Sequence, residues 1–267
     1  METAQPRVVL PGARKNLAKS ATRALDVLEY FASEQRPLRA VDVAQALGFR
    51  ASSTDQLLKT MVDSGYLVFD SQRKDYYPTP RLIRFGSWLG RSYHGSDRLA
   101  ELLIELGART EDTVTLALRQ GVSMQLVDVV RCPGESALVR KGLKVPILGT
   151  SLGAAWLSSR GDAELYRVSR QLERTNERGE DVWGQIRDAV DQVRRRGFAV
   201  SGNSASRLWA IAIPLPKNQA NVDLVLALAG PTQRRRPPDA ELAAIMRDCV
   251  DRILDLRGLA LDPVRRA

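Results

Sequence analysis

AQALGFRASSTDQLLKTMVDSGY, from Ala44 to Tyr66, reads as two short helices that meet at a tight joint at Gly48. Glycine commonly ends a helix because it adopts the left-handed conformation without strain, so Gly48 and Gly65 are the expected helix ends. Ser52 is the expected N-cap of the second helix, and Asp55 lies three residues later at the capping-box spacing. We expect the apolar residues of this helix to face inward, namely Leu57, Leu58, Met61 and Val62.

The segments on either side of this pair complete a small domain. Upstream, Ser20 is the expected N-cap of a helix whose apolar residues repeat at helical spacing as far as Phe31. Downstream, Tyr66–Asp70 and Tyr76–Pro78 have the pattern of two strands around a polar turn. Three helices followed by a hairpin predict a winged helix-turn-helix.

The polar face of the helix after Gly48 is the candidate DNA-binding surface. A recognition helix enters the major groove, so its first turn must be slim, polar and compatible with phosphate. Gln56 suits bidentate pairing with adenine, whereas basic and hydroxyl side chains suit phosphate. The candidate DNA contacts are Ser52, Ser53, Gln56, Lys59 and Thr60 on the helix, and Arg73 and Lys74 at the wing tip. The alternative is a small helical bundle with a solvated polar face.

Composition and charge agree with a soluble, DNA-binding protein. The chain has 267 residues, of which 44% are hydrophobic and 27% are charged, as is usual for globular domains. We find no apolar run that is long enough for a membrane span and no signal peptide. The net charge is +9, and its basic excess is denser in the first third, which favours a polyanionic partner. Cys132 and Cys249 stand far apart, without metal or redox spacing, which suits a reducing cytoplasm.

From Ser96 onward strands and helices alternate, which predicts an α+β domain. The expected helices are Asp97–Leu106, Leu152–Ser159, Ala163–Leu172, Val182–Arg196 and Ala240–Leu256. Expected strands include the alternating residues Val114, Leu116 and Leu118, followed by Val122–Val130, Ser136–Lys141, Val145–Leu148, Phe198–Ser201, Leu208–Leu215 and Val222–Ala229.

The motif GTSLG, residues 149–153, matches the nucleophile elbow of α/β-hydrolases. In that fold the catalytic histidine follows the serine in the chain, but His94 is the only histidine here and it precedes Ser151. We therefore expect no catalytic residue. A lone histidine also argues against a His-rich metal site, and without a glycine-rich phosphate loop we expect no nucleotide or other cofactor.

Several motifs taken together resemble the IclR family of bacterial transcriptional regulators. ATRALDVLEYFA, the stretch from Ala44 onward and YYPTPRLIRFGSWL are similar to the family's winged domain and linker helix. GLKVPILGTSLGAAWLSS, RRRGFAVS, AIAIPLP and VLALAGP are similar to its effector domain. The resemblance implies a GAF-like effector domain, a homodimer or homotetramer, a double-stranded DNA operator, and a small ligand that modulates operator binding.

The resemblance also implies an effector pocket whose residues depart from the family pattern. Carried over, the pocket residues are Gly153, Ala154, Ser201, Asn203, Trp209, Ala227 and Ala229. Ala154 stands where a lysine is usual, and Ala227 and Ala229 stand where serines are frequent. We expect a more apolar pocket with Trp209 as an aromatic wall, suited to an aromatic or apolar effector with one polar end. Trp209 as an ordinary core residue remains an open alternative.

The predicted architecture is an α+β protein of two domains. We expect a flexible basic arm at 1–18, a winged helix-turn-helix at 19–80, a dimerising linker helix at 81–95, a GAF-like effector domain at 96–258 and a tail at 259–267. The predicted function is a ligand-responsive regulator that binds a palindromic operator in the cytoplasm, without a membrane partner. Two alternatives remain open, namely a Ser151 hydrolase with an accessory domain and a regulator without a small-molecule effector.

Overall fold

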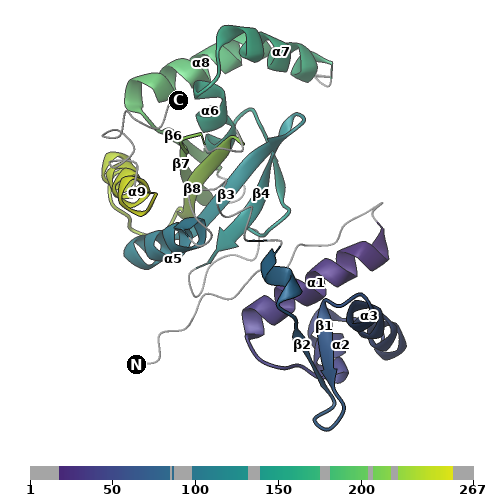
Figure 1. The fold of residues 1–267 in the computed structure, drawn as a ribbon. Helices are drawn as coiled ribbons and strands as arrows, with labels where there is room; N and C mark the ends of the chain where they lie inside the picture. Colours follow the sequence, from purple (N-terminus) through teal and green to yellow (C-terminus); the bar gives the residue numbers. More distant parts are fainter. Residues whose placement is uncertain are drawn as a thin grey trace, which may run out of the picture. The chain divides into compact units, whose positions relative to one another are not determined.

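Three helices and a two-stranded sheet form the N-terminal unit in the computed structural model (Figure 1). The helices are α1 (Lys19–Glu34), α2 (Ala40–Leu47) and α3 (Ala51–Asp63), and the antiparallel strands are β1 (Leu67–Asp70) and β2 (Asp75–Pro78). Their inward faces share one small core, made of Val27, Phe31, Leu38, Val43, Leu58, Met61, Leu67 and Tyr76. The winged helix-turn-helix predicted from the sequence is confirmed.

Glycines end both helices of the central pair, as predicted. Gly48 has φ +65° and Gly65 has φ +75°. The backbone N–H of Phe49 bonds to the carbonyl of Ala44, and that of Tyr66 bonds to the carbonyl of Met61. These bonds are those of the Schellman motif, which satisfies the last carbonyls of a helix and turns the chain sharply.

Both serine caps predicted for this unit were wrong. The N-cap residues are Ala18 for α1 and Arg50 for α3, so Ser20 and Ser52 already lie within the first helical turns. In α3 the carbonyl of Arg50 accepts the backbone N–H of Thr54, at 3.0 Å, and the hydroxyls of Ser53 and Thr54 donate to it as well. Because the carbonyl of Arg50 accepts the first helical hydrogen bond, α3 begins before Ser52. No side chain caps its N-terminus.

The structure describes residues 18–84, 86, 98–131, 139–174, 181–203, 207–217 and 222–254. Contacts divide the chain into two compact units, 7–91 and the part from 92 onward. Residues 81–84 and 86 are helical, and the rest of the linker helix expected at 81–95 lies outside the described residues, as do the expected arm up to residue 17 and the tail. Within the described ranges, no helix has the length and apolar character to cross a bilayer.

A six-stranded antiparallel sheet is the centre of the second unit. Its strand order is β5-β4-β3-β8-β7-β6. The strands are β3 (Thr113–Gln120), β4 (Ser123–Val130), β5 (Lys144–Pro146), β6 (Ala199–Asn203), β7 (Leu208–Pro214) and β8 (Leu224–Pro231). The short strand expected at Ser136–Lys141 is not formed at 139–141, and its first part lies outside the described residues.

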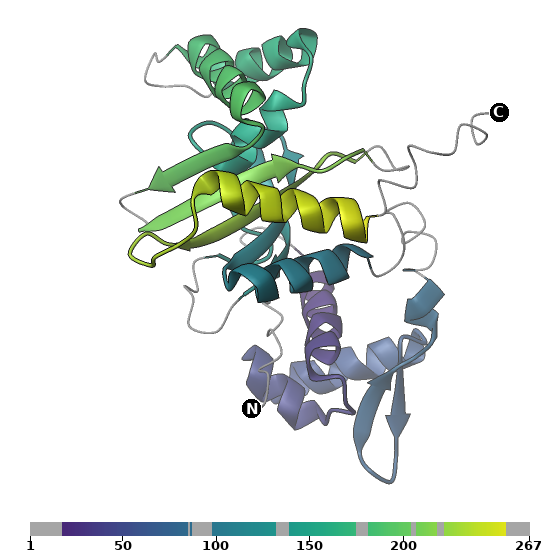
Figure 2. The same cartoon turned by 90° about the vertical axis from the view of Figure 1, so that its left-hand side faces the viewer.

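Helices cover both faces of this sheet (Figures 1 and 2). One face carries α5 (Arg98–Thr110) and α9 (Asp239–Ile253), and the other carries α6 (Ser151–Ser158), α7 (Asp162–Glu173) and α8 (Val182–Arg196). Alternate residues of each strand therefore enter different cores: Ile211 packs toward α5 and α9, whereas Ala212 packs toward α6 and α8. Burial on both faces explains why β8 is apolar throughout, whereas β3 carries buried Thr113 and Thr115 among its apolar residues. The predicted α+β class is confirmed.

Candidate DNA-binding surface and effector cavity

The outward face of α3 carries the predicted DNA contacts. Ser52, Gln56, Lys59 and Thr60 are exposed and Ser53 is half-buried, while Leu58 and Met61 face the core. The Gln56 side chain makes no hydrogen bond within the described part of the chain, so its amide is available to a base edge. The hydroxyl of Thr60 donates to the carbonyl of Gln56 at 2.9 Å.

Two of the predicted basic contacts already have acidic partners. Lys59 Nζ lies 2.8 Å from Asp55 Oδ2, and this hydrogen bond raises the pKa of Lys59. At the wing tip, the Asp70 carboxylate accepts the backbone N–H of Gln72 and of Arg73 and the side-chain Nε of Arg73. These bonds, led by the backbone N–H of Arg73, lower the pKa of Asp70. Lys74 adopts φ +57° at the turn and makes no ion pair within the described residues.

Two further arginines near the start of α3 were missed by the sequence reasoning. The Arg23 guanidinium lies over the Phe49 ring, 4.8 Å from its centroid, and donates to Ser53 Oγ at 3.5 Å. Arg50 is the N-cap of α3. Both extend the positive charge around the exposed first turn, and the only signal for Arg23 was its place on the polar side of α1.

A cavity of about 520 Å³ lies in the second unit, between the sheet and the start of α6. Small residues of β7 and β8 leave this space open, since Ala210, Ala227 and Ala229 all line it. Its other walls are largely aliphatic, with Leu126, Leu143, Val145, Leu152 and Leu208. The polar lining consists of the hydroxyl residues Thr115, Thr150, Ser151 and Ser201, together with Arg140. Its size and mostly apolar lining are those of a small-molecule site.

The first turn of α6 closes one end of this cavity. Thr150 is its N-cap, and the Thr150 hydroxyl accepts the backbone N–H of Gly153 at 3.2 Å. Ser201 of β6 supplies a second acceptor, since its Oγ accepts the backbone N–H of Ser151 at 3.0 Å. A Cβ on Gly153 would lie 1.7 Å from the carbonyl oxygen of Ile147. This close approach of two backbones explains the glycine at that position.

The structure brings some of the predicted pocket residues together and separates others. Ser201, Trp209, Ala227 and Ala229 line the cavity, whereas Gly153 and Ala154 are not among its lining residues and pack in α6. Asn203 ends β6, and its side chain lies outside the described part. These assignments to an effector site stay predictions.

Trp209 is among the residues that line the cavity, but its ring packs in a core on the other face of the sheet. Trp209 belongs to the core between the sheet and helices α5 and α9, with Ile211 and Leu228, whereas Ala227 belongs to the core on the opposite face. Its ring lies under the Arg236 guanidinium, 4.3 Å from the centroid. Side chains alternate between faces along a strand, so the indole of Trp209 points away from the side chain of Ala210. This packing favours the alternative of a core aromatic residue, and a part for Trp209 in an effector site stays a prediction.

Four polar residues of the cavity were missed as site residues. Thr115 lines the cavity and has only 3% of its surface exposed. Thr150 and Ser151 had been considered only as part of a hydrolase-like motif, and Ser151 is 1% exposed. Arg140 lies within the strand expected at Ser136–Lys141, and that pattern did not mark it as a site residue. Only the pairing of distant strands brings Thr115 and Ser201 to the same cavity.

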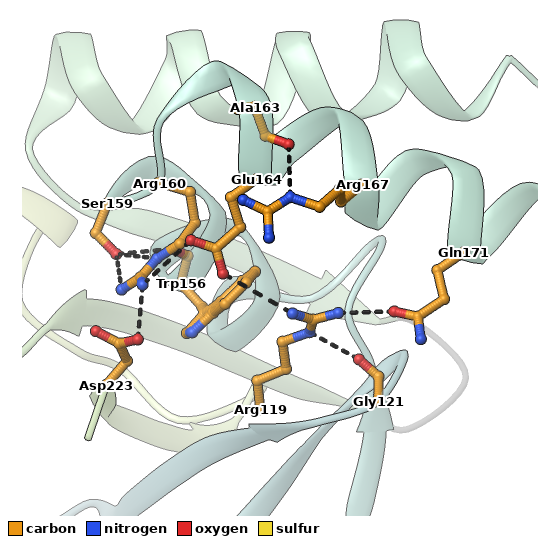
Figure 3. A network of polar contacts seen from close by, with 10 residues as sticks. All are labelled: Arg119, Gly121, Trp156, Ser159, Arg160, Ala163, Glu164, Arg167, Gln171 and Asp223. Carbon is orange, nitrogen blue, oxygen red and sulfur yellow. Dashed lines mark hydrogen bonds and ion pairs between the residues drawn. The ribbon is translucent and has the colours of Figure 1, made fainter. Parts of the chain in front are cut away.

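A polar network anchors the opposite end of α6 (Figure 3). Two guanidiniums, those of Arg119 and Arg160, each lie 4.8 Å from the centroid of the Trp156 ring. Arg160 pairs with Asp223 at 2.6 Å and with Glu164 at 3.6 Å. Arg119 donates to the carbonyl of Gly121 and to the side chain of Gln171, both at 2.8 Å. The network ties α6 to α7 and to the sheet, and so holds the helix that closes the cavity.

Comparisons with known proteins agree with this arrangement. The model described as "IclR helix-turn-helix domain" matches residues 20–71, and that described as "Bacterial transcriptional regulator IclR C-terminal" matches residues 97–254. The HTH-type transcriptional regulator XynR of Escherichia coli K12 is 25% identical over 236 residues, which cover 85% of this chain and 91% of XynR. These relatives are regulators and not enzymes, so the hydrolase alternative is excluded.

Solved structures of low sequence identity share the fold. The IclR of Thermotoga maritima has a TM-score of 0.55 at 18% identity, covering 90% of this chain and 98% of that one. An IclR homologue of Microbacterium hydrocarbonoxydans, solved in complex with 4-hydroxybenzoate, has a TM-score of 0.54 at 17% identity, covering 89% of this chain and all of that one.

Proposed function

The chain belongs to the IclR family of bacterial transcriptional regulators, and we propose that it binds a palindromic operator as a homodimer or homotetramer under the control of a small effector. The observation that carries this proposal is the cavity of about 520 Å³ at the start of α6, in the domain that binds effectors in this family. A regulator that senses no small molecule has no use for such a space, because an unfilled cavity costs stability.

DNA reading is proposed for the exposed face of α3 and the wing. Gln56 has a free amide on the exposed face, and it reads one base pair in the major groove. Lys74, at the wing tip without an acidic partner in the described part, contacts phosphate. Lys59 is paired with Asp55, and Arg73 is paired with Asp70. Each of these ion pairs must break before the basic side chain can bind phosphate.

The effector is proposed to have an apolar body and one polar end. Support comes from the aliphatic walls of the cavity, from the hydroxyls at the start of α6, and from the 4-hydroxybenzoate bound by the Microbacterium homologue. The Trp209 ring packs on the other face of the sheet, so this proposal does not depend on stacking against it. We place this activity in the cytoplasm, where DNA and metabolites meet.

Self-association is proposed to run through the linker helix, because a single winged domain covers only one half of a palindrome. Ile83, in the described part of that segment, is helical and 68% exposed, although its side chain is large and apolar. A second copy of the helix would bury it. Sedimentation of the full chain, with and without an operator duplex, distinguishes dimer from tetramer.

Selection of sites from random duplexes, followed by gel-shift titration at several salt concentrations, tests the DNA half of the proposal. We expect a palindromic site bound at least ~10³-fold more tightly than random DNA. Gln56→Ala should relax discrimination at one base pair in each half-site by about 1–3 kcal/mol. Lys74→Ala should weaken binding to all sequences and lower the salt slope by about one, whereas Lys144→Ala, in the other unit, should change neither. Absence of any preferred sequence would refute operator binding.

Filling the cavity tests the effector half. Ala229 lines the cavity, and Ala163 is exposed on α7 outside it. Ala229→Leu should abolish the thermal shift that a panel of aromatic and aliphatic ligands produces, without loss of operator binding, whereas Ala163→Leu should leave the shift unchanged. If no ligand of the panel raises the melting temperature of the wild type, the result contradicts this proposal. It would then favour the alternative of a regulator without a small-molecule effector.

A further inference from the structure

We propose that Arg23 of α1 binds a backbone phosphate of the operator beside the first turn of α3, and thereby fixes the position of this helix in the major groove. The inference rests on the proposed function, because it assumes that the exposed face of α3 reads DNA. It adds a DNA contact from a helix that the sequence did not connect with binding.

The side-chain contacts of Arg23 place its guanidinium at the start of α3. Its Nη1 donates to Ser53 Oγ at 3.5 Å, and Ser53 lies in the first turn of this helix. Gln56, which is proposed to read a base, follows three residues later on the same side of the helix. When a helix lies in the major groove, the phosphates of both strands border it. The guanidinium therefore lies where the backbone passes when Gln56 meets a base edge.

Phe49 holds this guanidinium before DNA binds. The guanidinium carbon lies over the Phe49 ring, 4.8 Å from its centroid. Phe49 is part of the joint between α2 and α3, since its backbone N–H bonds to the carbonyl of Ala44 at 2.9 Å and its ring packs against the core of the unit. A guanidinium held on a ring loses less freedom when it binds, and most of its N–H donors stay available to a phosphate.

Arg23 forms no ion pair within the described part of the chain, unlike two other basic side chains of this surface. Lys59 Nζ lies 2.8 Å from Asp55 Oδ2, and Arg73 Nε lies 2.9 Å from Asp70 Oδ2. A phosphate gains less from these two, because each must first lose its carboxylate. Arg23 gives up only a long bond to a neutral serine hydroxyl, so its contact with phosphate is the more favourable one.

The same contacts favour a phosphate over a base edge as the partner of Arg23. Arg23 is half-buried against Phe49 and Ser53, whereas Gln56 is exposed on α3. Base edges lie deeper in the groove than phosphates, so the exposed side chain of α3 reaches them and the half-buried arginine does not. Arg23 therefore contributes affinity without sequence preference.

Gel-shift titrations of the full-length protein test this contact, with the duplex obtained by selection and a random-sequence duplex at several salt concentrations. Arg23→Gln should weaken binding to both duplexes about tenfold and lower the salt slope by about one, because one phosphate contact is lost. Arg23→Lys keeps the charge but not the planar fork, so it should restore the slope and part of the affinity. Arg195→Gln, at an exposed arginine of α8, should change neither quantity.

Neutral phosphate analogues locate the contact on the selected duplex. Methylphosphonate groups replace its backbone phosphates one at a time. At one position in each half-site, we expect the replacement to weaken binding of the wild type about tenfold and to have no effect on Arg23→Gln, because that variant has already lost the contact. Phe49→Leu removes the ring under the guanidinium. It should weaken binding of the wild type, with no further loss in the Arg23→Gln background.

Two results would overturn the inference in different ways. If Arg23→Gln binds both duplexes as tightly as Arg195→Gln does, or if no phosphate position loses its effect in Arg23→Gln, the role of Arg23 is wrong while operator binding through α3 stands. If the wild type prefers no duplex, the proposed function is wrong, and the inference fails with it. Circular dichroism checks the fold of each variant; if Arg23→Gln is unfolded, Arg23→Met takes its place, since its apolar side chain still packs on Phe49.

Discussion

Helices α3 and α6 each begin shortly after a glycine in the left-handed conformation, yet the first turn of α3 is exposed and that of α6 is buried. Gly48 and Gly149 have φ +65° and +73°, and small or hydroxyl residues follow both. Ser52 at the start of α3 is exposed, whereas Ser151 at the start of α6 is 1% exposed. The same local pattern therefore serves an open surface in one unit and a cavity wall in the other.

The partners of the two first turns account for this difference. No side chain caps α3, and the Arg23 guanidinium donates to Ser53 Oγ in its first turn at 3.5 Å. In α6, Thr150 and Ser201 accept the backbone N–H groups of Gly153 and Ser151. An uncapped, exposed turn keeps N–H groups for phosphate, while a buried turn must satisfy its N–H groups within the protein.

Gly153→Ala should have the largest effect of the substitutions that test this difference, because it disrupts the first turn of α6. The added Cβ would overlap backbone atoms of Ile147, which cannot move aside as a flexible side chain can. We expect the free energy of unfolding of the second unit to fall by about 3 kcal/mol or more, measured by urea denaturation. Gly202→Ala, where no atom lies within 4 Å of the added Cβ, is the control. Equal midpoints for the two variants would contradict the close approach.

Arg160→Met tests the anchor at the other end of α6. It removes the partner of Asp223 and one of the two guanidiniums on Trp156, at a side chain only 7% exposed. Because Asp223 and Glu164 are partly exposed and can rehydrate, we expect a loss of about 2 kcal/mol rather than the larger cost of a fully buried pair. Arg170→Met removes the exposed pair with Glu173 and should cost less than about 0.5 kcal/mol. Comparable losses of unfolding free energy in the two variants would show that the network stabilises the protein no more than an exposed ion pair does.

Ser201→Ala and Ser52→Ala compare the two first turns directly. Ser201→Ala leaves the Ser151 N–H without its acceptor and should cost about 1–2 kcal/mol in thermal unfolding. Ser52→Ala changes an exposed side chain that caps no helix, so its effect on stability should be within about 0.5 kcal/mol. A stability loss at Ser52 as large as that at Ser201 would mean that the turn of α3 is not free for DNA.

The smallest expected effect concerns the wing. Asp70 accepts hydrogen bonds that lower its pKa, with the backbone N–H of Arg73 first and the Arg73 side chain second. A lowered folded pKa stabilises the turn at neutral pH, and this contribution is lost only as the pH falls through the folded pKa. NMR titration should therefore place Asp70 below its ordinary value. Arg73→Gln should raise it only in part, because the backbone bonds remain; a complete return to the ordinary value would contradict this order.

Much of the first unit was predictable, because its signals are local. The helical spacing of apolar residues around Phe31 and Leu58, and the glycines that end α2 and α3, need only neighbouring residues. The exact helix starts were missed, since Ser20 and Ser52 satisfy the cap pattern as well as the true starts do, and only the bond from Thr54 N–H to Arg50 decides.

The cavity was predictable only in part, because its residues come from separate strands. Ala227 and Ser201 were found through resemblance to a family, whereas Arg140 and Thr115 had no local signal. Trp209 was assigned to the wrong face, because strand alternation does not say which face carries which helices. Pairing of β7 with β6 and β8 settles this, placing Ala210 opposite Ser201 and Ala229.

By itself the sequence determined the order of elements, the winged helix-turn-helix, the α+β class and the absence of a histidine after Ser151, since each depends on spacing along the chain. Tertiary structure alone decided which residues share the cavity and that the Trp209 ring packs in the core on the other face of the sheet. It also decided that Arg140 borders the cavity without a partner in the described part. The physical reason is that burial and pairing depend on contacts between residues far apart in the chain, and local spacing carries no information about those contacts.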